Sequence, residues 1–283
     1  MGGPGGGCVP GTMEGVNGSN DGHAPPHAPP AVVFVHAHPD DEAIFTGGTM
    51  ARLAQDGCRV VLVVCTGGEL GLTTPDAVDA HALGAQRRHE TLAAAGTLGV
   101  SRLVHLDHVD SGMAGDPAND APGSFWSTDV ELAAKTIAAV FDEERPAAVV
   151  GYDAGGMYGH PDHVQVHRVT RRAAELAGIA TVYDATVDRE HLHFVETHLV
   201  EEAALTGDLG LVRSHIGVAT AEVTTTIDVR PWLATKRAAM AAHASQIPDS
   251  TSALQLPPDH FADVYGWEWY VRTGPPSLLD ALG

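Results

Sequence analysis

The chain of 283 residues is poor in cysteine, in basic residues and in long apolar runs. Its three cysteines, Cys8, Cys58 and Cys65, are too few and too irregularly spaced for a disulfide scaffold. Cys58 and Cys65 fall in or beside a predicted strand, where a small buried thiol packs well. Sixteen Lys and Arg residues against 36 Asp and Glu residues give a formal charge of −20. Such a surface repels nucleic acid and anionic lipid, so we expect neither as a partner.

No apolar stretch approaches the ~18 residues that a membrane span needs, so no membrane partner is expected. The N-terminus also lacks a basic start followed by an apolar core, the pattern of a signal peptide. These absences predict a cytoplasmic protein. The sequence is compatible with a homo-oligomer.

Residues 1–30 are rich in Gly, Pro, Asn and His and contain almost no large apolar residue. Such a segment cannot bury enough surface to offset its chain entropy, so we predict a disordered leader. Residues 31–283 are within reach of one large α/β catalytic domain.

Short apolar runs alternate with helical patterns from Ala31 onward. Continuous apolar strands of this kind are typical of a parallel sheet covered on both faces. We therefore predict an α/β, Rossmann-like doubly wound, mostly parallel sheet with an irregular C-terminal part. No G-x-G-x-x-G follows the first strand, so dinucleotide binding is not expected. Strands are predicted at 31–35, 59–66, 101–107, 147–151 and 181–187, and helices at 42–57, 84–100, 128–146 (capped by Ser127 or Thr128) and 163–178.

Two clusters of titratable residues contain the same H-P-D triplet. "HAHPDDE" at 36–42 follows the first predicted strand, and "YGHPDHVQVH" at 158–167 lies beyond the fourth. In open parallel sheets, ligands bind beyond the carboxyl ends of the strands. We therefore expect the two clusters to meet at one edge of the sheet.

Two imidazoles and one carboxylate are a suitable ligand set for catalytic zinc with one open position for water. His38, Asp41 and His163 supply such a set, and ferrous iron would suit it almost as well. Asp40 would then lie beside the metal without binding it, where a carboxylate can take a proton from the water that the metal holds.

The second cluster supplies two further candidates. His160, if protonated, could stabilise an oxyanion or protonate a leaving amine. Asp162, two residues later, could hold that imidazole charged and oriented.

Simpler interpretations exist for these residues. Acids in the first turn of a helix favour its dipole, which alone could explain the acidic run that ends at Glu42. His167 lies on the same helix face as His163, so this pair could be the ligands instead, although no Glu stands between them as in H-E-x-x-H. His36 alternates with apolar neighbours and is more simply a packed or supporting residue.

With these motifs the sequence resembles the LmbE/PIG-L family of zinc-dependent N-acetylglucosaminyl deacetylases. The motif A-H-P-D-D-E is present at 37–42 and H-P-D-H at 160–163, and together they are specific. The resemblance extends from about Val32 to Ile247. It includes "CTGGELG" at 65–71 and "KRAAMAAHASQI" at 236–247, and in the actinobacterial mycothiol branch also "DSGMAG" at 110–115 and "GGMYGHPDH" at 155–163.

The resemblance implies a zinc hydrolase of N-acyl amino sugars in which His38, Asp41 and His163 bind the metal. Asp40 is implied as the general base. His160 is implied to stabilise the oxyanion or to act as the acid, with Asp162 behind it.

Three further roles are implied by the resemblance alone. Tyr158 is placed to polarise the substrate carbonyl, and Arg87 and Asp110 match residues that contact the sugar. Simpler alternatives are a packed loop aromatic for Tyr158, an i,i+3 pair with Glu90 for Arg87, and a turn cap for Asp110.

Phe45 departs from the pattern, because the mycothiol-conjugate amidase branch carries a lysine there and the biosynthetic deacetylase a small polar residue. A bulky apolar group would change the acceptor side of the pocket. The sequence thus predicts an N-deacetylase or amidase that acts by attack of metal-bound water, in thiol-cofactor or specialised-metabolite biosynthesis. Two alternatives are a metal-dependent esterase or phosphoesterase, for which the second set of metal ligands is missing, and a non-catalytic module that binds sugar or metal.

Overall fold

A computed structural model describes residues 29–71, 79–195, 216–248 and 251–283, together with Met1 and Thr197. The predicted disordered leader at 1–30 lies almost entirely outside the described residues. Among the described helices, none combines the length and apolar character needed to cross a membrane.

Seven strands form one sheet in the order β3-β2-β1-β4-β5-β7-β6. The first five pair in parallel, and the last two are antiparallel to their neighbours. The predicted α/β fold is therefore confirmed. Its strands are β1 (Ala31–His36), β2 (Arg59–Thr66), β3 (Arg102–His108), β4 (Ala148–Tyr152), β5 (Val182–Thr186), β6 (Thr225–Asp228) and β7 (Trp267–Thr273).

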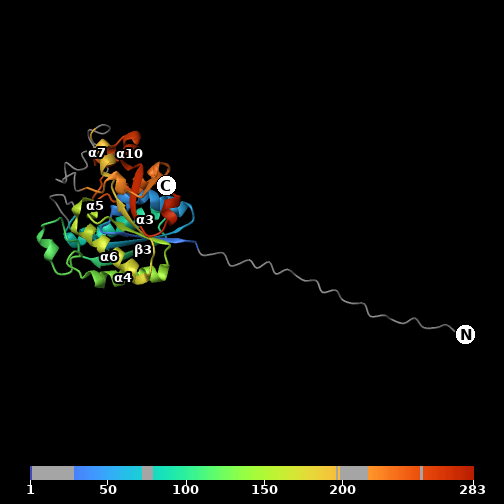
Figure 1. Cartoon of the computed structure of the whole chain (residues 1–283). Helices are drawn as coiled ribbons and strands as arrows, with labels where there is room; N and C mark the ends of the chain where they lie inside the picture. Colours follow the sequence, from blue (N-terminus) through green and yellow to red (C-terminus); the bar gives the residue numbers. More distant parts are fainter. Residues whose placement is uncertain (2–28, 72–78, 196, 198–215, 249–250) are drawn as a thin grey trace.

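Helices cover both faces of the sheet (Figure 1). On one face α4 (Val130–Glu144) packs against α6 (Pro161–Ala177), and on the other α8 (Leu233–Ala242) packs against α2 (Gly47–Gln55) and α3 (Ala80–Leu98). Right-handed crossovers require this arrangement, because the chain moves outward from β1 to β3 in one direction and from β4 to β5 in the other. The shorter helices are α1 (Asp41–Phe45), α5 (Gly156–Gly159), α7 (Arg189–Phe194), α9 (Ser252–Gln255) and α10 (Pro258–Tyr265).

The direction in which the chain adds strands to the sheet reverses between β1 and β4. These two strands are neighbours in space although two strands separate them in the chain. Such a switch point opens a crevice at the carboxyl ends of the strands. The polar motif at 36–42 leaves β1 at this point, and the motif at 158–167 lies just beyond β4. The topology thus places both motifs at one crevice.

Three local predictions differ from the structure. The helix predicted at 42–57 is two helices, because Thr46 leaves helical geometry (φ −135°, ψ 6°) and its hydroxyl pairs with His36 Nε2 at 2.9 Å. The cap of α4 is the carboxylate of Asp129, which accepts the Leu132 N–H at 3.0 Å, and neither Ser127 nor Thr128. The C-terminal part is more regular than predicted, since it adds β6 and β7 to the sheet.

A buried ion pair attaches this C-terminal part to the first helices. Lys236 Nζ lies 2.7 Å from Glu268 Oε1, and both side chains are 1% exposed. The Glu268 carboxylate also accepts the N–H groups of Gly48 and Thr49 at 2.8 Å, at the N-terminus of α2. One carboxylate therefore joins β7, α8 and α2.

We expect Lys236→Met to lower the free energy of unfolding by about 3–5 kcal/mol, because it leaves the buried Glu268 charge without its cation. Urea unfolding measures this loss. The matched control is Lys135→Met on the surface of α4, where Nζ lies 3.8 Å from Glu131 and the lysine is 64% exposed. There the expected change is below about 1 kcal/mol. Equal effects of the two substitutions would contradict the role of Glu268 as a joint.

Candidate metal and active site

Three side chains from the two motifs meet at the crevice in a nearly equilateral triangle. His38 Nδ1 lies 3.4 Å from Asp41 Oδ2, His163 Nε2 lies 3.3 Å from the same oxygen, and the two ring nitrogens are 3.3 Å apart. A tetrahedral zinc ion with ligands at 2.0–2.1 Å separates its ligand atoms by about 3.3–3.4 Å. The spacing therefore fits one ion with a tetrahedral preference.

Local backbone geometry explains how these side chains reach one point. His38 lies in the turn after β1, Asp41 begins α1, and His163 lies in the first turn of α6. Gly156 is required before α6, because its φ is +62° and a Cβ there would lie 2.7 Å from the backbone nitrogen of Val164. A larger residue would push the loop away from the N-terminus of α6.

The charges around His38 favour a cation. Burial alone would lower the pKa of His38, but the carboxylates of Asp110, Asp162 and Asp41 outweigh it and raise that pKa well above its usual value. The Asp162 and Asp110 oxygens lie 3.2 and 3.7 Å from His38 Nε2. The same negative potential would stabilise a divalent ion, so charge as well as spacing fits a metal.

Two other groups of side chains in the described residues lie close enough together to hold a metal ion. The ligand atoms of His38, His160 and His163 lie within 4.8 Å of one another, and so do those of His38, Asp110, His160 and Asp162. Asp41 is in neither of these groups, but we favour the His38, Asp41 and His163 set because all three of its ligand-atom distances, 3.4, 3.3 and 3.3 Å, match the spacing of a tetrahedral ion.

His167, the alternative partner of His163, contacts other groups. Its Nδ1 lies 2.8 Å from the carbonyl oxygen of Tyr152 and 3.7 Å from Asp184. The paired-histidine alternative therefore has no support in the geometry.

The Asp162 carboxylate, predicted from the sequence to hold the His160 ring, bonds other groups in the structure. It bonds His38 Nε2 at 3.2 Å, and Ser111 through both N–H (2.9 Å) and hydroxyl (2.5 Å). A carboxylate on the second nitrogen of an imidazole fixes the ring so that the first nitrogen can bind a metal. Ser111 was not predicted, although it directly follows Asp110 in the motif at 110–115.

His160 is held by backbone instead. Its Nδ1 accepts the N–H of Asp162 at 3.1 Å, as the N-cap of α6, so the proton of a neutral ring belongs on Nε2. Burial, together with the charges of His38 and His163, lowers the pKa of His160 to about 2. The lowered pKa favours a neutral imidazole that donates through Nε2 over the protonated form considered from the sequence.

Asp40 lies at the rim of the triangle in a strained conformation. Its φ of +99° is rare for a residue with a Cβ and costs about 1–3 kcal/mol, which neighbouring contacts must offset. Arg87 donates to Asp40 Oδ2 at 3.2 Å and to the Pro39 carbonyl at 2.5 Å. Glu42 Oε2 accepts the Asp40 N–H at 3.0 Å. Burial raises the pKa of Asp40 to about 6, against the opposing charge of Arg87.

Arg87 is 3% exposed and also donates to the Gly68 carbonyl at 2.6 Å. The simpler alternative for Arg87 was an i,i+3 pair with Glu90. In the structure the Glu90 carboxylate instead accepts hydrogen bonds from Ser245 and Gln86. Arg87 thus supports the backbone and carboxylate of Asp40, and its contact with a sugar stays a prediction.

Asp110 and Tyr158 line the crevice near the triangle. Asp110 accepts the Gly112 N–H at 2.8 Å, so the turn cap considered from the sequence is present, and the side chain is also only 3.7 Å from His38. The Tyr158 hydroxyl lies 3.4 Å from His163 Nε2, and burial raises its pKa well above the usual value. Tyr158 is therefore a neutral hydroxyl donor beside the triangle.

Below Asp40, Glu42 forms a second buried pair with His243 from the end of α8. The two atoms, Glu42 Oε1 and His243 Nε2, are 2.6 Å apart, and both side chains are fully buried. Glu42 is therefore more than an acid that favours the helix dipole. The sequence gives little signal for this pair, because the two residues are 201 positions apart.

The Glu42–His243 pair predicts a pH-dependent stability. Burial lowers the pKa of His243, but the charge and hydrogen bond of Glu42 outweigh it and raise that pKa above 6.5. The pair therefore contributes stability that is fully present below pH 6.5 and declines as pH rises through the folded pKa. We expect the difference in unfolding free energy between wild type and His243→Gln to shrink between pH 6 and pH 9. Urea unfolding across this range measures it, and a constant difference would contradict an ionised pair.

Comparisons of the sequence with known proteins identify one family. The family model described as GlcNAc-PI de-N-acetylase (PIG-L) matches residues 33–174. The chain is 40% identical over 269 residues to the 1D-myo-inositol 2-acetamido-2-deoxy-alpha-D-glucopyranoside deacetylase of Thermobispora bispora, covering 87% of this chain and 89% of the relative.

Solved structures share the fold at lower identity. The N,N'-diacetylchitobiose deacetylase of Pyrococcus horikoshii has a TM-score of 0.55 and 23% identity, covering 89% of this chain and 84% of that one. A deacetylase of teicoplanin biosynthesis has a TM-score of 0.58 and 18% identity, covering 87% and 98%. At these identities the structures support the fold only.

Proposed function

Because the chain belongs to the PIG-L family of de-N-acetylases, we propose that it is a zinc-dependent hydrolase that removes an N-acetyl group from an amino-sugar conjugate. The observation that carries the metal part of this proposal is the triangle of 3.3–3.4 Å between His38, Asp41 and His163. The relatives whose names describe a 2-acetamido sugar support the substrate class.

His38 Nδ1, Asp41 Oδ2 and His163 Nε2 would hold the ion. When bound, zinc would polarise the amide carbonyl and make water acidic enough to lose a proton near neutral pH. Asp162 and Ser111 support this set by fixing the His38 ring. Ferrous iron would be held by the same atoms, and the spacing alone does not choose between the two metals.

Asp40 is the base in this proposal. Its carboxylate lines the same crevice as the triangle and accepts a hydrogen bond from Arg87. Asp40 is not one of the three proposed metal ligands. A pKa of about 6 leaves it ionised at neutral pH and still able to receive a proton. Glu42 and Arg87 hold it in the strained position from which it reaches the substrate side of the crevice.

Two neutral donors stand on the other side of the triangle. The Nε2–H of His160 and the hydroxyl of Tyr158 can both donate to the oxygen on which negative charge develops during amide hydrolysis. The ring of His160 lies against that of His38, with centroids 4.5 Å apart, so the donor is next to the proposed metal. Asp110 and Arg87 are the proposed sugar contacts, since both line the same crevice.

Metal analysis of anaerobically purified protein, combined with a substrate panel, tests the proposal. We expect about one zinc or iron per chain and release of acetate from N-acetylglucosamine conjugates that stops when a chelator is added. Carboxylate esters and phosphate esters form the comparison arm. Hydrolysis of phosphate esters with no release of acetate would favour the phosphoesterase alternative, and metal binding without any turnover would favour a binding module.

A further inference from the structure

The crevice beside the triangle opens into a cavity of about 600 Å³ with two unlike walls. The polar wall, as we call it, consists of Asp40, Arg87 and Asp110, which follow β1, β2 and β3 in the chain, and of Gln246, which follows α8. The lining from α1, α7, α8, α10 and β7 is mainly apolar, although it also includes His191 and the buried ion pair of Lys236 and Glu268. Its side chains include Phe45, Leu192, Val195, Met240, Val264 and Trp269.

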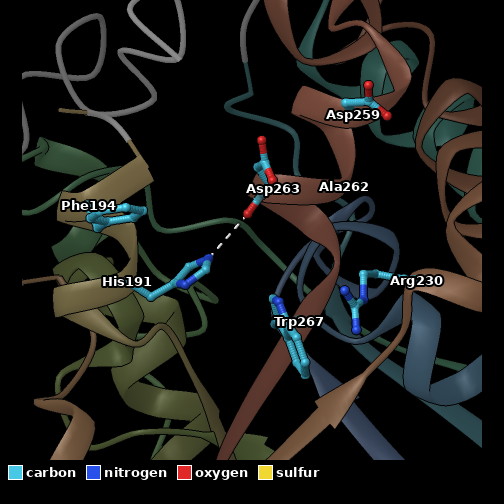
Figure 2. Close-up of a pocket in the computed structure, with 7 residues that line it drawn as sticks. All are labelled: His191, Phe194, Arg230, Asp259, Ala262, Asp263 and Trp267. Carbon is cyan, nitrogen blue, oxygen red and sulfur yellow. Dashed lines mark hydrogen bonds between the residues drawn. The ribbon is translucent and has the colours of Figure 1, made fainter. Parts of the chain in front are cut away.

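A second cavity of about 280 Å³ shares His191 and Trp267 with the first. Figure 2 shows His191 and Phe194 of α7 on one side of it, and Trp267 and Arg230 on the other. Phe194 is 52% exposed, and the Arg230 guanidinium lies 4.7 Å from the centre of the Trp267 ring. This second cavity is half polar, since His191, Arg230, Asp259 and Asp263 line it; the apolar part of the first cavity is what we call the apolar arm.

An amino sugar alone does not match this arm. Cavities of roughly 300–1,000 Å³ with mainly apolar walls are typical of sites for drug-sized ligands. A sugar ring carries hydroxyl groups around its edge, and burying them against apolar side chains without hydrogen bonds is unfavourable. The polar wall suits the sugar, and the arm suits a different part of the same substrate.

We propose that the substrate is a 2-acetamido sugar whose aglycone is a large alkyl or aryl group, and that the apolar arm binds this aglycone. The inference rests on the proposed deacetylase function. In such a sugar, the carbon that bears the amide lies between C1, which carries the aglycone, and C3, which carries a hydroxyl. With the amide at the triangle and the C3 and C4 hydroxyls toward Asp110 and Arg87, C1 faces the arm.

Phe45 lies where the arm begins. Its ring centre is 6.3 Å from those of Tyr152 and His163, so it forms an apolar surface directly beside the metal triangle. This position explains how a single residue at the end of α1 would exclude a polar aglycone and favour an apolar one. The sequence predicted that Phe45 changes the acceptor side of the pocket, and the cavity indicates that this change favours an apolar aglycone.

A series of glycosides of N-acetylglucosamine tests the inference. With the zinc-loaded full chain, we expect kcat/KM to rise from methyl to butyl to hexyl glycoside by about tenfold for every two methylenes buried. The comparison series keeps the methyl glycoside and lengthens the acyl group from acetyl to butyryl to hexanoyl, and there we expect no rise. A rise with acyl length and none with aglycone length would overturn the assignment.

Leu192→Asn and Leu132→Asn are matched variants. Leu192 is half-buried on α7 and lines the arm, whereas Leu132 is 64% exposed on α4. We expect the hexyl-to-methyl ratio of kcat/KM to fall at least fivefold in Leu192→Asn and to be kept in Leu132→Asn. Calorimetry with the deacetylated hexyl and methyl glycosides should show the same loss of preference in Kd, without dependence on turnover.

The outcomes separate this inference from the function on which it rests. If no glycoside releases acetate, the proposed deacetylase function is contradicted. If all glycosides release acetate at equal kcat/KM, only the aglycone assignment fails. A preference for the hexyl glycoside that survives Leu192→Asn unchanged would mean that the aglycone binds outside the arm, and would also overturn the inference.

Discussion

Asp40→Asn is expected to keep its metal and to lose turnover by about 10²–10⁴-fold. The amide of asparagine has the shape of the carboxylate but cannot accept the proton, so the contribution of a general base disappears. Asparagine also tolerates positive φ better than most residues, which makes it a gentler change than alanine at the φ of +99° found here. Metal analysis and kcat for acetate release, measured on the same preparation, test both halves of the prediction.

Asp107 offers a matched control for Asp40→Asn. It is also an aspartate with positive φ (+61°), and it also pairs with an arginine, Arg88, but it is exposed at the end of β3. Asp107→Asn should leave kcat within about twofold, since the residue is exposed and is not part of the crevice lining. Wild-type turnover in Asp40→Asn would remove Asp40 from the mechanism, and loss of metal would make it a ligand or a structural residue.

The sequence predicted where the site would be because its motifs fall at strand ends. Strands β1 and β4 could be recognised as buried apolar runs, and polar residues directly after such runs lie at the carboxyl edge of the sheet. Hydrogen-bond partners were less accessible to this reasoning. Asp162 is two residues from His160 in the chain, yet its carboxylate faces His38, which is 124 positions away. Proximity in sequence was the wrong guide because residues in the first turn of a helix point in different directions.

The C-terminal third shows what periodicity could not predict. Strand β7 has mixed burial along its length, and β6 has only four residues, so neither gives the continuous apolar signal of β1 or β2. Their place in the sheet depends on long-range contacts such as the pair between Lys236 and Glu268. The same region builds much of the apolar arm, so its consequence for specificity could not be predicted without the fold.

His163→Ala should remove nearly all bound metal and, with it, all measurable turnover. A tetrahedral site that loses one of three protein ligands keeps only His38 and Asp41, which come from a single turn of chain. His163 is fully buried, so the substitution also leaves a space beside Tyr152, whose ring stacks on it at 4.5 Å between centroids. Stability must therefore be measured as well, and a thermal unfolding curve that remains cooperative shows that the metal is lost from a folded chain.

His167→Ala is the control that decides between the two histidines of α6. It lies one helical turn after His163 on the same face of α6, but its Nδ1 is engaged with the Tyr152 carbonyl oxygen, 2.8 Å away. We expect metal content equal to wild type in His167→Ala and below about a tenth of it in His163→Ala. Full metal content in His163→Ala would show that the triangle at 38, 41 and 163 does not hold the ion, and loss of metal in His167→Ala alone would restore the paired-histidine alternative.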